Sequence, residues 1–511
     1  MTEAQNQFAA TPLHTAENTF PLPGHQGLKL EEKLLFDQSR AGSYGVDLPE
    51  VKNTTSRTGL PVRETVGLPE VSEPQVVRHF VRLSQMNYSI DGGLFPLGSC
   101  TMKHNPRLNE KLARLPGFAA LHPMQPDSTT QGALELVYTL ENWLAELCGL
   151  PGITLAPAAG AHGELTGMLV VKKALEARGE KRPLVLVSDS AHGTNPATAR
   201  TCGFDIVSVP SGDDGLVDYD AFAALVDKHG KDIAAFMVTN PNTCGRFEKD
   251  VTRIADKLHS IGAYFYCDGA NFNAIVGKVR PGDLGVDVMQ FNLHKTFSTP
   301  HGGGGPGCGP VGVTEELTKF LPIPKVKKDG ETYSLVTDCP HSIGRIKAFH
   351  GHFGMMVRAL AYMMSHGADG LQRVAEDAVL NANYMLHHLK DTFHVPFKGY
   401  CMHECLLTDK FLKDKHVSTL DIAKGLIEYG YHPMTVYFPL VVSGAMLIEP
   451  TETESKQSLD EFINTMKHLA QLAESKGEDS FKQFPLSTPR RRLDEVKAAR
   501  QPELKWTAEQ A

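Results

Sequence analysis

The stretch at residues 290–309 reads QFNLHKTFSTPHGGGGPGCG, and it decides how the rest of the chain is interpreted. The largely apolar run at 286–293 predicts a strand that is buried on one or both faces. Lys295 follows this strand directly, and four consecutive glycines stand at 302–305. Because glycine raises the entropy cost of ordering a loop, these glycines indicate that the backbone needs positive φ angles or a close approach there.

Three interpretations of Lys295 are open from this stretch alone. Most clusters of lysine and glycine are surface turns with a solvated lysine. A P-loop is excluded because the lysine precedes the glycines and the chain contains no G-x-x-x-x-G-K-[ST] string. The third interpretation is a partly desolvated amine that forms a Schiff base with a carbonyl cofactor. The rest of the chain favours this third interpretation.

Composition restricts the class of protein. The chain has 511 residues, of which 41% are hydrophobic and 22% charged, enough for a large core and more than one domain. The net charge of -8 argues against nucleic acid or an anionic membrane surface as the main partner. The first twenty residues lack the pattern of a secretory signal, and no stretch is long and apolar enough to span a bilayer. We expect a cytoplasmic protein that binds small molecules and other proteins.

The nine cysteines are scattered through a long chain, which is typical of reduced thiols in a cytoplasmic protein. Cys401 and Cys405 flank His403, a pattern that could indicate a metal site. No second pair of ligands stands at the spacing of a zinc finger, so we expect no metal.

We expect three parts in the chain. Residues 1–110 form an N-terminal arm and a substrate-facing loop, 111–345 a large α/β domain, and 346–511 a small α+β domain with a tail. Short helices are expected in the arm at 28–36 and 75–86. An irregular arm of this kind usually lies over a partner subunit or over its own domain.

Strands and helices alternate through the large domain. This alternation predicts a mostly parallel sheet with helices on its faces. Right-handed crossovers then bring the carboxyl ends of the strands to one edge, where ligands bind in such sheets. In the small domain, an apolar run at 436–442 and another that ends near Ile448 predict two further strands. The strands predicted in the large domain lie at 153–157, 183–188, 204–209, 233–239, 263–267 and 286–293.

Polar clusters follow these strands one after another. Each cluster alone is weak evidence for a binding site, since a tight turn also favours such residues. Together they predict one binding site at the edge of the sheet. The clusters lie at 158–164, 189–195, 240–243, 268–271 and 294–301.

These clusters contain what a pyridoxal phosphate site needs. Lys295 supplies an amine for the Schiff base, and Asp268 is placed to keep the pyridine nitrogen protonated. His192 can stack on the ring and handle protons. The turn at 158–164 can hold the phosphate through backbone N–H groups, with His294 or Thr296 assisting. Asp268 as a turn residue and His192 as a capping or core residue are the alternatives.

We therefore expect Lys295 and His192 to be catalytic. The expected cofactor-binding residues are Lys295, His192, Asp268, Gly160, Ala161, His162, Thr194, Asn240, Ala270 and His294. A loop near residue 100 is rich in hydrogen-bond donors, and it is either an ordinary turn or a loop that faces the substrate. The expected substrate residues in it are Ser99, Cys100 and Thr101.

Seven segments resemble the P-protein of the glycine cleavage system, and more closely the second of the two subunits into which that protein is divided in some bacteria and archaea. The resemblance covers residues from about 30 to about 475. The segments are YSIDGGLFPLGSCTMKHNP, GAHGELTGML, SAHGTNPATA, VTNPNTCGRFE, CDGANFNAIVG, NLHKTFSTPHGGGGPGCGPVGV and LIEPTETESK.

The resemblance implies a fold-type-I transferase that depends on pyridoxal phosphate, with a large mostly parallel seven-stranded sheet, helices on both faces and a smaller C-terminal α+β domain. Lys295 would carry the cofactor as a covalent Schiff base, His192 would stack on the ring, and Asp268 would contact the pyridine nitrogen. The glycines at 302–305 would shape the entry near the lysine. Alanines at 158 and 159 stand where a hydroxyl often lies, so the phosphate would depend more on backbone N–H groups.

The resemblance also implies an activity and partners. The activity is glycine decarboxylation with release of CO2 and transfer of the aminomethyl group to the lipoyl arm of the H-protein. The partners are subunit 1 in an α2β2 heterotetramer, the H-protein and, through function, the T-protein and the L-protein.

Two other functions stay open. A different fold-type-I enzyme, such as an aminotransferase or cysteine desulfurase, would need other groups, for instance a reactive cysteine on a mobile loop. Cys308 lies near the glycines, but Pro306 and Pro310 stiffen its loop. A non-catalytic structural subunit is the other alternative, and retention of Lys295 with Asp268 and His192 argues against it.

Overall fold

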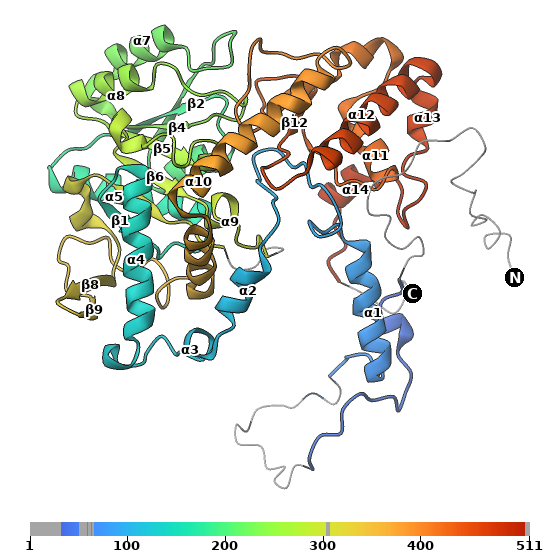
Figure 1. The fold of residues 1–511 in the computed structure, drawn as a ribbon, viewed down its shortest axis with the longest axis horizontal. Coiled ribbons are helices and arrows are strands. Elements are labelled where there is room, and N and C mark those ends of the chain that lie inside the picture. The colour runs from blue at the N-terminus through green and yellow to red at the C-terminus, as the bar shows by residue number, and fades with distance from the viewer. Residues whose placement is uncertain (1–31, 51–58, 60–62, 64–65, 303–306, 506–511) are drawn as a thin grey trace, which may run out of the picture.

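The structure, a computed structural model, describes residues 32–50, 59, 63, 66–302 and 307–505 (Figure 1). Its largest element is a seven-stranded sheet with the strand order β1-β7-β6-β5-β4-β2-β3. Strands β3, β2, β4, β5 and β6 run parallel, and β7 is antiparallel to both of its neighbours. The mostly parallel sheet predicted from the sequence is thus confirmed. Its strands are β1 (Gly152–Thr154), β2 (Leu184–Ser188), β3 (Asp205–Val209), β4 (Ile233–Thr239), β5 (Tyr264–Gly269), β6 (Val288–Phe291) and β7 (Val311–Val313).

Helices cover both faces of this sheet. Alternate residues of β4 enter different cores, because successive side chains of a strand point to opposite faces. Phe236 packs in the core that contains α4, α7, α8 and the first half of α10, whereas Met237 packs with α5 and α6. The helices around the sheet are α4 (Gln131–Cys148), α5 (Gly160–Ala177), α6 (Thr194–Thr201), α7 (Tyr219–His229), α8 (Val251–Ser260), α9 (Leu293–Thr296) and α10 (Phe353–Leu389).

Helix α5 lies unusually close to the sheet. A Cβ atom on Gly163 would meet the backbone oxygen of Gly309 at 2.6 Å. One on Gly167 would meet the ring of Tyr266 at 2.7 Å and Val288 at 2.9 Å. Glycine is therefore needed at both positions, and the close approach fixes where the N-terminus of α5 points.

Helix α10 joins the large sheet to a second core. It is kinked at Gly367, which has a φ of 64°, and Figure 1 shows it running from the sheet toward α11, α12 and α13. The second core surrounds a three-stranded antiparallel sheet with the order β10-β12-β11. Its elements are β10 (Cys405–Thr408), α11 (Thr419–Glu428), β11 (Thr435–Val436), β12 (Ala445–Ile448), α12 (Lys456–Lys476) and α13 (Glu478–Lys482).

Shorter elements complete the described chain. Strands β8 and β9 form an antiparallel hairpin in the segment between β7 and α10. The division of the chain into three parts at residues 110 and 345 stays a prediction. None of the described helices is long and apolar enough to cross a membrane. The shorter elements are α1 (Glu73–Met86), α2 (Arg107–Ala113), α3 (Pro116–Ala119), β8 (Lys325–Asp329), β9 (Thr332–Val336), α14 (Glu495–Arg500), and the 3-10 turns η2 (Phe36–Gln38), η3 (Asp127–Thr129), η4 (Gly230–Asp232), η5 (Phe272–Ala274), η6 (Pro281–Leu284), η7 (Glu315–Phe320) and η8 (Asp409–Lys415).

Two sequence-based expectations for the secondary structure were wrong. The helix expected at 28–36 lies partly outside the described residues, and its described part carries only the start of η2. The strand expected at 436–442 ends at Val436, because Pro439 lacks the N–H that a ladder needs. The helix expected at 75–86 is present as α1, which stands apart from both sheets in Figure 1.

The close packing of α5 gives a testable prediction. Gly167→Ala should lower the free energy of unfolding by about 1–3 kcal/mol, because the new methyl group collides with Tyr266 and Val288. Gly132→Ala is the matched control in α4, where an added Cβ has no neighbour within 4 Å. It should raise stability by about 0.5–1 kcal/mol. Urea unfolding measures both, and equal effects of the two variants would contradict the packing argument.

Candidate functional site

The predicted polar clusters meet at the carboxyl end of the parallel strands. Asp268 lies in β5, His192 on the loop between β2 and α6, and Lys295 in α9 directly after β6. The structure brings the first two into contact, with His192 Nε2 at 2.9 Å from Asp268 Oδ2. The Lys295 charge also acts on the Asp268 carboxylate. One site therefore collects side chains from separate strand ends, as expected for such a sheet.

Asp268 is completely buried and surrounded by donors. Burial alone would raise its pKa, but the hydrogen bond and charge of His192, with the N–H of Ala270, hold that pKa below its ordinary value. The acid therefore stays ionised inside the protein. Its donors are His192 Nε2 (2.9 Å), Ala270 N (2.9 Å), Asn195 Nδ2 (3.3 Å), Thr239 Oγ1 (3.4 Å) and Gln290 Nε2.

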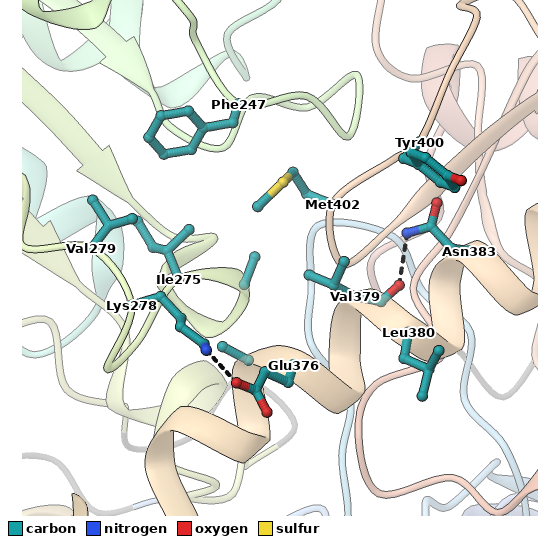
Figure 2. A pocket seen from close by; sticks show the side chains of 12 residues that line it. Phe247, Ile275, Lys278, Val279, Glu376, Val379, Leu380, Asn383, Tyr400 and Met402 are labelled. Atoms are coloured by element: carbon teal, nitrogen blue, oxygen red, sulfur yellow. Dashed lines mark hydrogen bonds and ion pairs between the residues drawn. The ribbon is translucent and has the colours of Figure 1, made fainter. Parts of the chain in front are cut away.

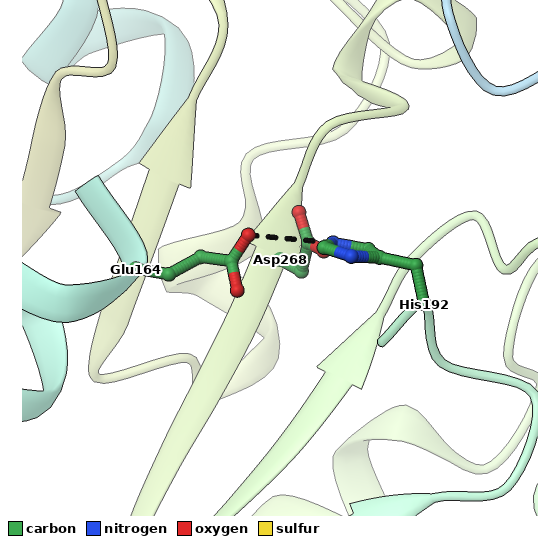
Figure 3. A group of neighbouring side chains, drawn as sticks. All are labelled: Glu164, His192 and Asp268. Atoms are coloured by element: carbon green, nitrogen blue, oxygen red, sulfur yellow. Dashed lines mark hydrogen bonds and ion pairs between the residues drawn. The ribbon is translucent and has the colours of Figure 1, made fainter. Parts of the chain in front are cut away.

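His192 points its Nε2 atom toward two acids, as Figure 3 shows. Its Nε2 is also 3.3 Å from Glu164 Oε1, which belongs to α5. Burial lowers the pKa of His192, but the hydrogen bonds of Asp268 and Glu164 outweigh it and raise the pKa to about 10. Burial raises the pKa of Glu164. The Nε2 atom thus donates its proton to an ionised acid, while Nδ1 faces the backbone N–H of Thr194.

The segment that carries Lys295 contains several buried polar atoms without a hydrogen-bond partner among the described residues. Lys295 Nζ itself donates to the backbone oxygen of Ser99 at 2.8 Å. Buried polar atoms in folded proteins nearly always have a partner, so several orphans in one segment indicate room for a polar ligand. The atoms of this segment that have no partner in the described part of the chain are Asn292 Oδ1, His294 Nδ1, Thr296 Oγ1, Thr299 Oγ1 and His301 Nε2.

The N-terminus of α5 is open to an anion. Its N-cap, Ala159, supplies no side-chain hydrogen bond, so the N–H groups of the first turn at Gly160, Ala161 and His162 remain free of a cap. A Cβ on Gly160 would collide with Asn292 Oδ1, which places this turn against the segment that carries Lys295. The residues present therefore fit pyridoxal phosphate: an amine, an ionised acid and an anion site at one sheet edge.

The other predicted cofactor residues lie in the same region, but they contact one another. The backbone N–H of Thr194 donates to His192 Nδ1 at 3.1 Å, and that of Ala270 donates to Asp268. The Asn240 side-chain oxygen accepts from the N–H of Glu248 at 3.1 Å. His294 packs edge-on against His301, and burial lowers its pKa to about 3. Glycines 303–305 lie outside the described residues.

The loop at 97–105, here called the strap, crosses the site from the N-terminal side. Ser99 and Thr101 have positive φ angles of 59° and 32°, each of which costs about 1–3 kcal/mol in a residue with a side chain. The Ser99 hydroxyl donates to Glu404 at 3.1 Å, and the Thr101 hydroxyl donates to Glu449 at 2.5 Å. Two of the three predicted substrate residues thus use their hydroxyls inside the protein.

Lys103 anchors the other half of the strap. It is 3% exposed, and its Nζ lies 2.6 Å from Glu452 Oε1. The same atom is 2.8 Å from the backbone oxygen of Thr296, the neighbour of Lys295. The strap is therefore tied by an ion pair to Glu452 and by a hydrogen bond to the turn that carries Lys295.

Sequence reasoning missed several of these residues. Glu164 lies in the segment at 158–164, in which the backbone N–H groups, the small residues and His162 were considered but not the carboxylate. Glu449 follows a buried strand as Asp268 does, a signal that could have identified it. His403 was considered with two cysteines, but it lies with Glu404 and Glu449. All nine cysteines are within the described residues and are free thiols.

A separate hollow of 630 Å³ lies between η5 and α10 (Figure 2). Its lining is mostly apolar, and it contains none of the predicted site residues. Lys278 and Glu376 form an ion pair at its edge, and Asn383 donates to the backbone oxygen of Val379. Its polar groups are therefore paired with one another, unlike those around Lys295.

A mostly parallel sheet with one antiparallel strand, carrying a lysine on the turn after β6, is the fold of the fold-type-I enzymes that use pyridoxal phosphate. Solved structures agree. One of glycine decarboxylase (P-protein) of the glycine cleavage system, in inhibitor-bound form, matches with a TM-score of 0.67 at 20% identity over 81% of this chain and 92% of that chain. One of Oryza sativa TDC with PLP and tryptamine matches with a TM-score of 0.64 at 15% identity over 88% and 93%.

Sequence comparison identifies the family. Residues 165–334 match the class-V aminotransferases, and residues 374–485 match the C-terminal domain of glycine dehydrogenase. The probable glycine dehydrogenase (decarboxylating) subunit 2 of Caulobacter vibrioides is 56% identical over 95% of this chain and 94% of its own length. That of Chlorobium chlorochromatii is 52% identical over 92% and 99%. The chain belongs to the glycine dehydrogenase (decarboxylating) subunit 2 family.

The His192 contacts predict a pH dependence of stability. A histidine whose pKa rises from 6.5 to about 10 on folding stabilises the protein fully below pH 6.5, and this contribution is lost as the pH rises toward 10. His192→Gln should therefore lose less stability than the unmodified protein between about pH 6.5 and about pH 9.5. Urea unfolding at the two pH values measures this difference. His387→Gln, in α10, controls for the loss of an exposed imidazole, and equal losses in His192→Gln and the unmodified protein would refute the assignment.

The Lys103 ion pair predicts a large effect on stability. Lys103→Met should lower the free energy of unfolding by about 3–5 kcal/mol, because Glu452 would be left buried without its cation. The control is Lys456→Met, which removes an exposed pair with Asp460 and should cost about 0–1 kcal/mol. Urea unfolding compares them, and a Lys103 variant as stable as the control would rule out the anchoring role.

Proposed function

We propose that this chain catalyses the pyridoxal-phosphate-dependent decarboxylation of glycine, releases CO2 and transfers the aminomethyl group to the lipoyl arm of the H-protein. The observation that carries the proposal is the juxtaposition of Lys295 with the ionised acid Asp268, in a chain 56% identical over 95% of its length to a probable glycine dehydrogenase (decarboxylating) subunit 2. When bound, the cofactor supplies an electron sink for the pair of electrons left as the carboxylate departs.

Each part of the site has a role in this proposal. Lys295 would hold the cofactor as a Schiff base, Asp268 would hold its pyridine nitrogen, and the first turn of α5 would hold its phosphate. His192 would stack on the ring and hold a proton. A ring nitrogen bound to Asp268 would compete with His192 for Oδ2, so the imidazole would have to share or release its hydrogen bond to that oxygen.

The strap would form the substrate side of the site. Support comes from the contact of Ser99 O with Lys295 Nζ. Because the hydroxyls of Ser99 and Thr101 are used by glutamates, Cys100 is the member of the trio whose side chain remains for the substrate.

We further infer the assembly that the family name implies. The chain would pair with subunit 1 in an α2β2 heterotetramer, receive the lipoylated H-protein, and act with the T-protein and the L-protein in the cytoplasm. The net charge of -8 and the free thiols support protein partners in a reducing compartment.

A cysteine desulfurase would need a reactive thiol near Lys295, and the expected candidate does not suit that role. Cys308 is completely buried, and burial raises its pKa to about 12. A thiol held in its neutral form is a weak nucleophile. The remaining alternative is a non-catalytic structural subunit, and the following experiment distinguishes it from an enzyme.

The test is an absorption spectrum of the chain with its partner subunit and pyridoxal phosphate, before and after borohydride reduction, followed by peptide mapping. We expect a visible band that reduction removes and a phosphopyridoxyl group on Lys295. Lys103 is the internal control in the same map, because its amine is fully hydrogen-bonded and should carry no adduct.

The same complex is then assayed for glycine-dependent exchange of labelled CO2 in the presence of lipoylated H-protein. Lys295→Ala should abolish both adduct and exchange, and Lys327→Ala, on the exposed hairpin strand β8, should change neither. If the complex takes up no cofactor, the proposal that this chain is an enzyme is refuted and the structural-subunit alternative remains.

A further inference from the structure

Two buried glutamates lie side by side at the end of the small sheet. Glu404 directly precedes β10 and Glu449 directly follows β12, and the neighbouring residues Cys405 and Ile448 are paired across the antiparallel ladder. Both glutamates are 0% exposed. One oxygen of each, together with a nitrogen of His403, lies within 4.8 Å of the others.

These two carboxylates hold the strap on either side of Cys100. The backbone N–H of Ser99 donates to Glu404 at 2.7 Å, and that of Thr101 donates to Glu449 at 3.0 Å. The hydroxyls of the same two residues donate to the same two acids. Each glutamate therefore grips one residue whose φ angle is positive, and the strained arch between them is defined by four hydrogen bonds.

The arch cannot relax toward the small sheet. A Cβ on Gly98 would meet the backbone oxygen of Leu447 at 2.5 Å, so the strap already lies against β12. The Gly98 oxygen accepts from Thr435 Oγ1 at 2.8 Å. Gly98, which precedes the arch, is thus held against β12 and β11.

The clamp reaches Lys295 through one residue. Ser99 gives its N–H and hydroxyl to Glu404 and its carbonyl oxygen to Lys295 Nζ at 2.8 Å. Any change in the hold of Glu404 on Ser99 therefore moves the acceptor of the lysine.

Two carboxylates in such a place cannot both be ionised at low cost. Burial raises the pKa of Glu449 to about 7, and burial with the charge of Glu449 raises that of Glu404 well above its usual range. Beside them stands His403, whose two ring nitrogens have no partner and whose Nε2 is 3.8 Å from Glu449 Oε1. The other titratable groups whose charge acts on the pair or feels it are Lys295, Lys103 with its partner Glu452, Cys100, Cys244, Cys401 and Cys405.

Burial and the charge of Lys295 lower the pKa of His403 to about 3, so the imidazole is neutral. A neutral imidazole offers an acceptor for a proton carried by the pair, and Lys295 supplies one positive charge nearby. One proton on the two glutamates therefore balances the charges without a further ion.

We propose that Glu404 and Glu449 share one proton and together hold Ser99, Cys100 and Thr101 arched beside Lys295, as positioning residues for that lysine. The importance of the arch for the reaction rests on the proposed function, whereas the clamp itself does not. Loss of the shared proton would leave two charges side by side in a buried site, and the arch would open.

The test follows the accessibility of Cys100. Cys100 and Cys339 are half-buried, and the other seven cysteines are buried. The rate of alkylation by N-ethylmaleimide, read by peptide mass spectrometry as the ratio of Cys100 to Cys339, reports the arch with Cys339 as internal standard. The full complex is used without substrate, so the readout does not depend on activity.

Glu449→Ala removes both acceptors of Thr101 and should raise the ratio about 10-fold or more through local opening. Glu449→Gln keeps the shape and stays neutral, so it should remain within about 3-fold of the unmodified protein. Thr101→Val, which loses only the hydroxyl bond, gives a milder variant should the alanine variant fail to fold, and it should raise the ratio by a smaller factor.

The shared proton is tested by pH. Above about pH 8 the pair keeps one proton, because the pKa of Glu449 is about 7 and that of Glu404 lies well above its usual range. As the pH rises further, the ratio should rise more in the unmodified protein than in Glu449→Gln, because only the unmodified protein then acquires a second buried carboxylate charge. Burial raises the pKa of Cys100 and the charges of Glu449 and Glu404 raise it further, so loss of the shared proton lowers its thiolate fraction. Faster alkylation in the unmodified protein therefore reports opening of the arch and not titration of the thiol. Equal pH profiles, or an alanine variant with an unchanged ratio, would overturn the proposal.

Two further outcomes are decisive. A change of the ratio on adding a chelator would also overturn the proposal, because a metal ion at His403, Glu404 and Glu449 would then hold the pair. A complex in which Cys100 is protected but Lys295 takes up no cofactor would refute the proposed function and leave the clamp intact.

Discussion

The ammonium group of Lys103 lies within hydrogen-bonding distance of four acceptors from four separate segments. They are Asn273 Oδ1 in η5, the backbone oxygen of Thr296 in α9, the hydroxyl of Tyr362 in α10, and Glu452 after β12. Burial lowers the pKa of this lysine, and the carboxylate of Glu452 at 2.6 Å opposes that effect. Because a buried charge is tolerated only with its partners in place, the large sheet, the long helix and the small sheet are fixed relative to one another through this group.

The charges around Lys295 come from both sheets. Glu164, His192 and Asp268 stand at the end of the large sheet, whereas Glu404 and Glu449 stand at the end of the small one. The charge of Lys295 acts on Asp268 in the first group and on Glu404 in the second. Ser99 of the strap is hydrogen-bonded to both Lys295 and Glu404. The site therefore exists only when the two cores are docked, which gives the buried ion pair at Lys103 a direct consequence for the chemistry.

The sequence predicted the parts of this arrangement that depend on local pattern. Apolar strands alternating with helices specify a parallel sheet, and Asp268 and Lys295 each follow such a strand, so both could be identified without the structure. The clamp could not be found in the same way, because its partners are far apart in the chain. Ser99 and Glu404 are separated by 305 residues, and Thr101 and Glu449 by 348. The strand expected at 436–442 ends at Val436, because an apolar segment cannot continue a ladder through Pro439, which has no N–H to donate.

The site contains both polar atoms that already have hydrogen-bond partners in the protein and polar atoms that have none. Asp268 receives hydrogen bonds from five groups of the same chain, so its charge and position are set in advance of any ligand. On the lysine side, Asn292, Thr296 and Thr299 keep buried oxygens without partners among the described residues, and the side-chain oxygens of Asn195 and Gln290, beside Asp268, are unpaired as well. Each unpaired buried group costs about 1–3 kcal/mol, which a polar ligand can recover by bonding to it. Ligand binding and folding stability are therefore linked through these unpaired groups, while Asp268 supplies a preorganised charge.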